Sequence, residues 1–503
     1  MSHIIDSVEL QMSVLMPTFT TYQFIIEILV YGFVLAASFF VIAILWMYVC
    51  DKLQTKQAIR HNFPVIGRLR YLLEHWGTFF RQYFFALDRE EMPFNRAQRN
   101  WVYRAAKNLD TTVGFGSSRN LTIPGTVFFT NGLYPVLESE QTERSEVIFG
   151  PRTDHPFHCK SFFNISAMSF GAISVPAVRA LSRGAKLAGI WMNTGEGGLS
   201  PYHLEGGCDL VFQIGTGKFG VRHGDGKLSD NKLKELASLP AIKMFEIKLS
   251  QGAKPGKGGI LPAIKVTEEI AQIRGIKQGE AAVSPNRFPE IEGPEDLLDM
   301  IDRVRSLSKK PTGIKLCLGN PTELESLCDA IVKRGLQSAP DFITIDSGDG
   351  GTGAAPMSLI DNVGMLVGES LPQVVDTLIR FGLRERVKVV ASGKLINPVD
   401  VAWALCAGAD IVNNSRGFMF ALGCIQAMQC NKNTCPTGIT THNKRLQAGL
   451  NPFDKAQRVA QYANNIMKEV ETIAHACGVK DPHQLNRHHV RIIVGNGKSV
   501  PYE

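Results

Sequence analysis

The strongest hydrophobic pattern in the chain is an uninterrupted apolar run near the N-terminus. From Ile28 to Val49 there is no charged residue, and a helix of this length spans a hydrocarbon core of about 30 Å. A signal peptide is the alternative, but Asp6, Glu9 and Glu27 precede the run, where a basic start is usual. The pattern therefore predicts an N-terminal segment, residues 1–50, that contains a transmembrane helix at about 28–49.

Residues 51–125 combine aromatic clusters, such as YLLEHW and TFFRQYFF, with frequent charges. This mixture predicts juxtamembrane helices. Such helices either lie in the lipid interface or form a collar packed on the main domain. No repeat or low-complexity linker marks the boundary near residue 125.

After residue 160, short apolar runs end in Gly, Ser or Thr turns and are followed by helical stretches, which is typical of βα units. The helical stretches include residues 176–187, 294–307, 321–335 and 397–408, with Pro or Asn near their starts and Gly near their ends. Eight strands are predicted: Phe162 to Ala167, Gly189 to Met192, Leu210 to Ile214, Met244 to Ile247, Gly313 to Leu316, Phe342 to Ile345, Val387 to Ala391 and Asp410 to Val412.

Eight such units fit an α/β fold, a (βα)8 TIM-type barrel over residues 126–460, followed by a C-terminal helical extension over residues 461–503. A doubly wound open sheet would show the same local pattern. In a barrel, the chemistry lies on the loops after the strand C-termini. The motifs at these strand ends must therefore decide between the two folds.

Charge and cysteine usage indicate the compartment. Lys52, Lys56, Arg60, Arg68 and Arg70 follow the apolar run and no Lys or Arg precedes it, so the positive-inside bias predicts a single-pass membrane protein with its catalytic bulk in the cytoplasm. The net charge of +7 over 503 residues is modest and does not favour nucleic acid as a partner. The ten cysteines are too dispersed for a disulfide framework.

Glycine-rich motifs recur at the ends of the predicted strands. They are MSFGAIS, NTGEGG, QIGTGKFG and IKLSQGAKPGKGG, then GIKL, SGDGGTGAAP, SGKL and NSRGF. Each alone is weak, because glycine is the default residue for turns with positive φ. Their recurrence at the same end of successive units indicates one binding site there.

Three cysteines lie close together in GCIQAMQCNKNTCP, at Cys424, Cys430 and Cys435. Thiolates are the usual ligands of iron–sulfur clusters, and three of them suit a cubane with one unligated corner. A zinc site usually requires a fourth ligand, and His442 lies at an unusual offset. Structural buried cysteines are the remaining alternative.

Over about residues 125–460 the chain resembles the FMN-binding synthase domain of glutamate synthase. The resemblance is carried by five motifs in this order: MSFG, NTGEGG, QGAKPGxGG, DGGTGA and GCxxxxxCxxxxCP. The N-terminal part resembles the membrane-bound FMN-binding glutamate-synthase-like proteins. Nothing resembles the glutaminase domain, and Ser2 stands where the amidotransferase cysteine would be. The resemblance implies a (βα)8 barrel with FMN, and a 3Fe-4S cluster on the three cysteines.

The resemblance, with general barrel physics, assigns the FMN phosphate to the loops after the seventh and eighth strands. Lys315, at the end of the fifth strand, is expected to hold the flavin N1/O2 edge, where negative charge develops on reduction. The expected FMN-binding residues are Ser169, Asn193, Gln213, Lys315, Gly350, Gly351, Gly393, Ser415, Arg416 and Gly417.

In glutamate synthases, FMN passes electrons to an imine made from 2-oxoglutarate and ammonia, while basic residues hold the substrate carboxylates. The matching catalytic residues here are Glu196, Lys248, Lys254 and Arg274. The chain departs from the family at Ile260, where the family has a glutamine, and at VSPNRFPEIEG, where the family is rich in histidine. An apolar side chain cannot replace an amide as a partner of a carboxylate.

No nicotinamide-binding GxGxxG unit is evident, so the expected electron donor is ferredoxin, a separate reductase or the quinone pool. Ammonia would come from solution or from a partner, and a homo-oligomer is compatible with the sequence. The second hypothesis is a membrane-tethered dehydrogenase that oxidises an amine or amino acid and passes electrons to a membrane acceptor. A third, an inactive scaffold barrel, is disfavoured because the cysteines and the glycine-rich loops are present.

Overall fold

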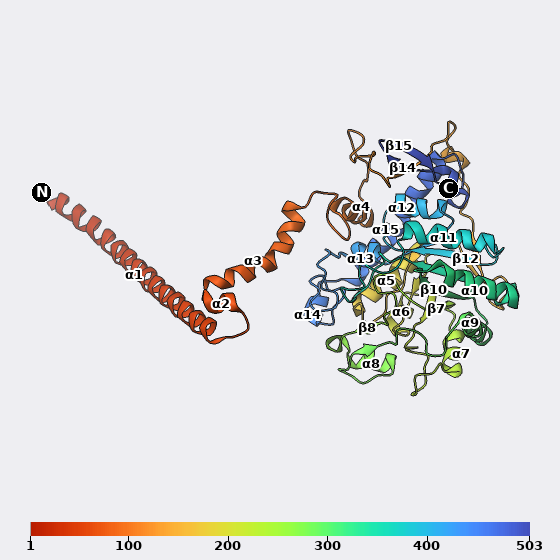
Figure 1. The fold of residues 1–503 in the computed structure, drawn as a ribbon. Coiled ribbons are helices and arrows are strands. Elements are labelled where there is room, and N and C mark those ends of the chain that lie inside the picture. Colours follow the sequence, from red (N-terminus) through yellow and green to blue (C-terminus); the bar gives the residue numbers. More distant parts are fainter. Residues whose placement is uncertain (1, 503) are drawn as a thin grey trace. The chain divides into compact units, whose positions relative to one another are not determined.

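The computed structural model describes residues 2–502, with the backbone alone at residues 2–20 and at residue 78. The chain divides into two compact units, Met1–Arg96 and Ala97–Glu503. Both are drawn in Figure 1.

The N-terminal unit begins with one long helix, α1 (Ser2–Leu53), drawn in red in Figure 1. Its part Thr21–Leu53 covers 33 residues, has a mean hydropathy of 2.7 over its apolar stretch and is not buried. This part is long and apolar enough to cross a membrane, and it includes the predicted segment 28–49. A signal sequence would pass the same test of length and composition.

Three short elements follow α1: α2 (Ala58–Asn62), α3 (Ile66–Phe80) and a π-helical turn, η1 (Arg81–Phe85). The next helix is α4 (Arg96–Ala106). Residues 107–126 contain neither helix nor strand, so the helical character predicted for 51–125 ends at Ala106. The physical reason is composition, because this stretch is rich in Gly, Ser, Thr and Asn, which favour loops over helices.

Eight parallel strands in the C-terminal unit form a closed barrel, in which the last strand pairs with the first. The predicted (βα)8 fold is therefore confirmed, and the open doubly wound sheet is excluded. The strands, in chain order, are β4 (Phe163–Ile165), β5 (Met192–Asn193), β6 (Leu210–Ile214), β7 (Ile242–Lys248), β10 (Thr312–Cys317), β11 (Phe342–Asp346), β12 (Lys388–Ser392) and β13 (Ile411–Asn414).

Each of these strands overlaps its predicted position, and β5 differs most. It was expected from Gly189 but begins at Met192. Gly189 has φ of 65° and ends the preceding helix as its left-handed C-cap, so it cannot also begin a strand. At Trp191, the backbone N–H donates to the side-chain oxygen of Asn164 in β4 at 2.9 Å, not to a backbone carbonyl of that strand.

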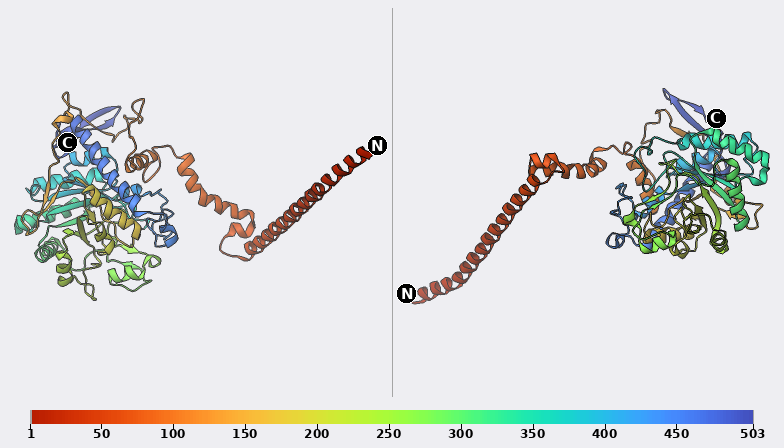
Figure 2. Two further views of the ribbon diagram at one scale, coloured as in Figure 1. Left: turned by 180° about the vertical axis from the view of Figure 1, so that it is seen from behind. Right: turned by 60° about the horizontal axis from the view of Figure 1, so that its bottom comes forward.

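The four predicted helical stretches are confirmed as α5 (Val175–Ala188), α9 (Pro294–Ser308), α10 (Pro321–Arg334) and α12 (Pro398–Cys406). Ser174, Asn320 and Asn397 precede three of them and accept a backbone N–H as N-caps. The other helices of the barrel are α6 (Pro201–Glu205), α7 (Asp230–Ser238), α8 (Glu268–Arg274), α11 (Val367–Arg380), α13 (Arg416–Leu422) and α14 (Lys444–Gln447). Figure 2 shows the helices outside the strands.

A short hairpin closes the N-terminal end of the barrel. It consists of β2 (Val147–Phe149) and β3 (Phe157–Cys159). Its apolar side chains pack in one buried cluster with side chains from the beginnings of several barrel strands, among them Trp191, Met244 and Phe342. Because this end is filled, the opposite end, where the strands terminate, is left for chemistry.

The C-terminal part is only partly helical. Helix α15 (Pro452–Ala476) packs along α5, and then β14 (Val490–Gly495) and β15 (Lys498–Pro501) form a hairpin that pairs with β1 (Val127–Phe129). The helical extension predicted for 461–503 thus ends at Ala476, apart from two short 3₁₀ turns. An Asn-Gly turn with positive φ at both residues, Asn496 and Gly497, joins β14 to β15, and such turns favour hairpins.

Candidate active site at the C-terminal mouth of the barrel

A buried carboxylate lies inside the barrel, below its mouth. Glu246 of β7 is 1% exposed. Its Oε1 accepts hydrogen bonds from Asn193 Nδ2 at 2.8 Å and Gln213 Nε2 at 2.6 Å, and its Oε2 accepts one from Thr344 Oγ1 at 2.6 Å. Two of the predicted FMN-binding residues, Asn193 and Gln213, are therefore held together by one residue of a third strand.

Lys315 of β10 is a predicted FMN-binding residue that carries a buried charge. Its Nζ lies 3.3 Å from Asp346 Oδ2, at the end of the neighbouring strand β11. Burial by itself would lower the pKa of Lys315, but the carboxylates of Asp346 and Glu246 outweigh this effect and raise it. The ammonium group is therefore held charged inside the barrel.

The four predicted catalytic residues come together at the mouth, and we call them the charged cluster: Glu196, Lys248, Lys254 and Arg274. Lys248 Nζ lies 2.8 Å from Glu196 Oε1. Burial would raise the pKa of Glu196, but the positive charges of the other three members lower it below its usual value. The cluster thus holds one ionised carboxylate among three cations.

Two members of the charged cluster come from the long connection between β7 and α9. Burial, and then the positive charge of Lys248, lower the pKa of Lys254 to about 8, and its Nζ donates to the carbonyl of Ala354 at 3.0 Å. Arg274 ends α8, is 4% exposed, and has its pKa lowered to about 10 by burial. Both cationic side chains are therefore largely shielded from solvent.

Arg274 also links the predicted catalytic and FMN-binding residues. Its Nη2 donates to Ser169 Oγ at 3.4 Å and to the carbonyl of Phe170 at 3.2 Å. A side chain at Gly197 would bring its Cβ to 2.8 Å from this Nη2. The NTGEGG motif therefore requires glycine at position 197 so that the guanidinium can approach the loop.

The predicted phosphate loops follow β12 and β13. Asn414 Oδ1 accepts the backbone N–H of Gly417 at 2.7 Å, and Arg416 Nη2 donates to the carbonyl of Asp349 at 2.7 Å. Burial lowers the pKa of Arg416 to about 10. A Cβ at Gly351 would lie 3.0 Å from Arg416 Nε, so the DGGTGA loop and the NSRGF loop are in close contact.

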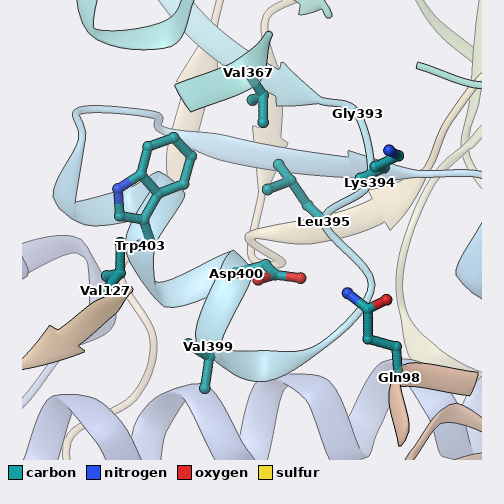
Figure 3. Close-up of a pocket in the computed structure, with 9 residues that line it drawn as sticks. All are labelled: Gln98, Val127, Val367, Gly393, Lys394, Leu395, Val399, Asp400 and Trp403. Carbon is teal, nitrogen blue, oxygen red and sulfur yellow. The ribbon is translucent and has the colours of Figure 1, made fainter. Parts of the chain in front are cut away.

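A pocket opens beside the loop after β12 (Figure 3). Gly393 and Lys394 lie at one side of it, and Asp400 and Trp403 of α12 lie opposite. Its remaining lining residues are Gln98, Val127, Val367, Leu395 and Val399. The pocket adjoins the predicted phosphate loop at Gly393 but includes no member of the charged cluster.

The three cysteines of the predicted cluster motif lie on the loop between α13 and α14. Burial raises the pKa of Cys424 to about 12 and also raises that of Cys430. At Cys435 the hydroxyls of Thr437 and Thr440 outweigh burial and lower the pKa. Within residues 2–502, no group of three or more His, Cys, Asp or Glu side chains lies close enough together to hold a metal ion.

Comparison with known proteins identifies the family. A family model described as the conserved region in glutamate synthase matches residues 129–480. The glutamate synthase large subunit-like protein YerD of Bacillus subtilis is 41% identical over 485 residues, which cover 88% of this chain and 91% of that protein. The chain belongs to the glutamate synthase family. The resemblance inferred from the motifs is therefore confirmed, and the chain is an oxidoreductase that acts on CH–NH2 groups.

Other members of the glutamate synthase family match a shorter part of the chain. The archaeal-type glutamate synthase [NADPH] of Thermotoga maritima is 34% identical over 62% of this chain and 59% of its own length. The archaeal glutamate synthase [NADPH] of Methanocaldococcus jannaschii is 33% identical over 67% of this chain and 63% of its own length. The chain thus spans about three fifths of these two relatives.

Among solved structures, the flavin-binding domain of baker's yeast flavocytochrome b2 is 13% identical, with a TM-score of 0.46 and 81% of each chain covered. A likeness at this level says nothing about function.

Several residues of this glutamate synthase family site were not found by sequence reasoning. They are Glu246, Thr344, Asp346 and Lys265. The period of two in strands could have found Glu246, because it lies two residues before Lys248 on β7 and therefore on the same face. The buried Lys265 donates from its Nζ to the carbonyls of Ala172 at 2.6 Å and Cys430 at 3.2 Å. It offered no such signal, because its position depends on the fold of the long connection after β7.

Proposed function

We propose that this chain is an FMN- and iron–sulfur-dependent oxidoreductase that reduces the imine of a 2-oxo acid, as in the formation of glutamate from 2-oxoglutarate and ammonia. The observation that carries the proposal is the charged cluster, in which one carboxylate lies among three cations at the barrel mouth. A protonated imine of a dicarboxylate presents one positive and two negative charges. The cluster complements both signs.

The proposed roles of the residues in the charged cluster follow from their charges. Arg274 and Lys254 hold the substrate carboxylates, and Arg274 can do so in a bidentate manner. Glu196 accepts the N–H of the protonated imine and stabilises its positive charge. Lys248, whose Nζ lies 2.8 Å from Glu196 Oε1, keeps that carboxylate ionised and in place. Transfer of a hydride to the carbon of the protonated imine then gives the amine directly.

The mouth of the barrel fits FMN. Ser347 Oγ and Asn413 Oδ1 are buried there without a hydrogen-bond partner in the part of the chain that the structure describes, and buried polar groups of this kind are normally satisfied. FMN supplies two-electron hydride chemistry when bound. The residues that would hold it are those predicted from the motifs, Ser169, Asn193, Gln213, Lys315, Gly350, Gly351, Gly393, Ser415, Arg416 and Gly417.

The cysteine loop fits a 3Fe-4S cluster by the chemistry of its donors. The charges of Cys430 and Cys435 act on the thiol of Cys424, and the charge of Cys435 acts on that of Cys430. The buried ammonium of Lys265 donates to the carbonyl of Cys430 at 3.2 Å, which suits a site of net negative charge. The three thiolates would hold the cluster, and the cluster would supply one-electron transfer.

We propose further that α1 anchors the protein in a membrane, with the barrel in the cytoplasm. The unburied apolar part Thr21–Leu53 supports the anchor, and the basic residues that follow it support the orientation. Electrons for the reduction would come from ferredoxin, a reductase subunit or quinone.

The anchor also favours a second candidate function. A membrane-tethered dehydrogenase of the same family would oxidise an amine or amino acid and pass the electrons to a membrane acceptor. Ile260 is compatible with this reading, because an apolar residue stands there in β8 (Ile260–Leu261) where the family has an amide.

The two candidates are distinguished by the direction of electron flow. Anaerobic protein reduced with dithionite is mixed with 2-oxoglutarate and ammonium, each alone serving as the control, and the flavin absorbance is followed. The synthase reaction predicts fast reoxidation that requires both compounds. Reduction of the oxidised flavin by an amine, without reoxidation by the pair, would support the dehydrogenase instead.

A further inference from the structure

Helix α3 and the turn η1 carry an apolar stripe that is exposed within its own unit, Met1–Arg96. We define this stripe by its six residues, which follow one another at intervals of three or four and have exposed fractions between 39% and 77%: Ile66, Leu69, Leu73, Trp76, Phe80 and Phe84. At this spacing all six lie on one face of the helix. The rings of Trp76, Phe80 and Phe84 follow one another, with centroids 6.1 Å and 5.9 Å apart.

Ion pairs and a hydrogen bond to Asp51 connect the beginning of α3 to the end of the apolar helix α1. Asp51, in the last turn of α1, has no exposed surface. Its carboxylate accepts hydrogen bonds from Arg60 at 2.6 Å, from Arg68 in the first turn of α3 at 2.8 Å, and from the backbone N–H of Val65 at 3.0 Å. If α1 crosses a membrane, the stripe therefore begins at the membrane surface.

The charge of the surrounding segment fits a lipid surface. Residues 51–85 contain six Lys or Arg residues and two acidic residues, and basic segments next to a span are attracted to anionic headgroups. At the aromatic end of the stripe, Trp76 has an amphipathic ring of the kind that lies at headgroup level, and Phe80 and Phe84 add the apolar surface of an interfacial helix. A stripe of this kind exposed to water would be an unusual feature.

We infer that α3 and η1 lie in the interface of the membrane that α1 crosses, with the stripe toward the acyl chains and the basic residues toward anionic headgroups. The inference rests on the anchor proposed above. It adds a second attachment, which continues directly from the first through the Asp51 ion pairs. The alternative occupants of the stripe are a second copy of the chain and the C-terminal unit of the same chain.

The test uses the two tryptophans of this unit as separate reporters. The full-length protein is reconstituted into vesicles of phosphatidylcholine and phosphatidylglycerol that contain brominated lipid, and tryptophan quenching is measured for the wild type, Trp46→Phe and Trp76→Phe. The fluorescence lost in each variant gives the contribution of Trp46 in α1 or of Trp76 in the stripe. Both contributions are expected to be quenched at least twofold, with Trp76 most sensitive to bromines near the headgroups.

A matched pair of variants tests the orientation of the helix. Leu73→Glu adds a negative charge within the stripe, and His75→Glu adds one on the opposite face. Leu73→Glu is expected to halve the quenching of Trp76 or reduce it further, whereas His75→Glu leaves it unchanged. Quenching of Trp46 without quenching of Trp76 would overturn the interfacial helix while leaving the anchor, and absence of both would overturn the anchor as well.

Discussion

The charged cluster contains three cations for one carboxylate, and Lys254 is the member whose charge is most easily changed. Its pKa is lowered to about 8 by burial and by Lys248, so its ammonium is present below this pH and is lost as the pH rises through it. We therefore expect the affinity for 2-oxoglutarate to fall between pH 7 and pH 9. Titration of the flavin spectrum with 2-oxoglutarate at a series of pH values measures this dependence.

The control for this prediction is Lys254→Arg, because arginine stays protonated over this range. The variant should bind with an affinity that changes little between pH 7 and pH 9. A wild-type affinity that does not depend on pH would remove Lys254 from the substrate site.

Glu246 allows a second prediction at the scale of single residues. Its two oxygens accept three hydrogen bonds, whereas a glutamine would offer one oxygen and would direct an NH2 group at another donor. An unsatisfied buried group destabilises by about 1–3 kcal/mol, so Glu246→Gln should lower the unfolding temperature and weaken FMN binding. Thermal unfolding and flavin release on dilution measure both effects.

The exposed Glu235 on α7 provides the matched control for the same chemical change. Glu235→Gln should leave both quantities at the wild-type values. Equal behaviour of the two variants would mean that Glu246 does not position Asn193 and Gln213.

The motifs indicated the site residues at the strand ends but not the side chains that hold them in place. Lys248 and Arg274 were found because they lie in motifs with a known pattern. Asp346 and Thr344 were not found, because a buried carboxylate or hydroxyl on an apolar strand becomes informative only when its neighbour on the next strand is known.

At the scale of elements, the loop that carries the three cysteines is the part whose role depends most directly on a cofactor. Cys430→Ser removes one thiolate ligand, so it should reduce the iron content of the purified protein to near zero. The unfolding temperature of the barrel should change by only a few degrees, because the cysteine loop contributes no strand to the barrel. Iron analysis and electron paramagnetic resonance measure the cluster.

Cys477, at the end of α15 and outside this loop, provides the control. Cys477→Ser should retain the full iron content. Retention of iron by Cys430→Ser as well would contradict the ligand assignment.

The beginning of α12 carries a carboxyl group whose protonation affects stability. Burial raises the pKa of Asp400, beside the pocket of Figure 3, to about 7, against an ordinary value of 3.8. Because the folded pKa lies above the unfolded one, the stabilisation from this group is complete below about pH 3.8 and is lost as the pH rises to 7.

Asp400→Asn cannot ionise, so its unfolding temperature relative to that of the wild type should increase from pH 4 to pH 7 and then remain constant. Thermal unfolding across this range checks the prediction. A constant difference between the two proteins at all pH values would show that Asp400 is not titrating in the folded state.

The elements themselves were largely predictable. Strands such as β6 and β11 are buried along their whole length, and short apolar runs between turns indicate them well. The hairpin of β14 and β15 was not predicted, because it is stabilised by pairing with β1, more than 350 residues earlier in the chain. Pairings of this kind cannot be inferred from local patterns.

At the scale of the whole molecule, all residues of the charged cluster and all predicted cofactor ligands lie in the unit Ala97–Glu503. The apolar helix and the stripe lie in Met1–Arg96. The proposed chemistry and the proposed membrane attachment are thus carried by different parts of the chain. Variants of one part should leave the function of the other unchanged.

A single turnover with labelled ammonium tests imine reduction at the charged cluster. Anaerobic, fully reduced protein is mixed with 2-oxoglutarate and ¹⁵N-ammonium, and the amino acid formed is measured by mass spectrometry. Imine reduction predicts ¹⁵N-glutamate in proportion to the flavin that is reoxidised, and its loss in Glu196→Gln. Reduced flavin that persists without any labelled amino acid would contradict imine reduction at this site.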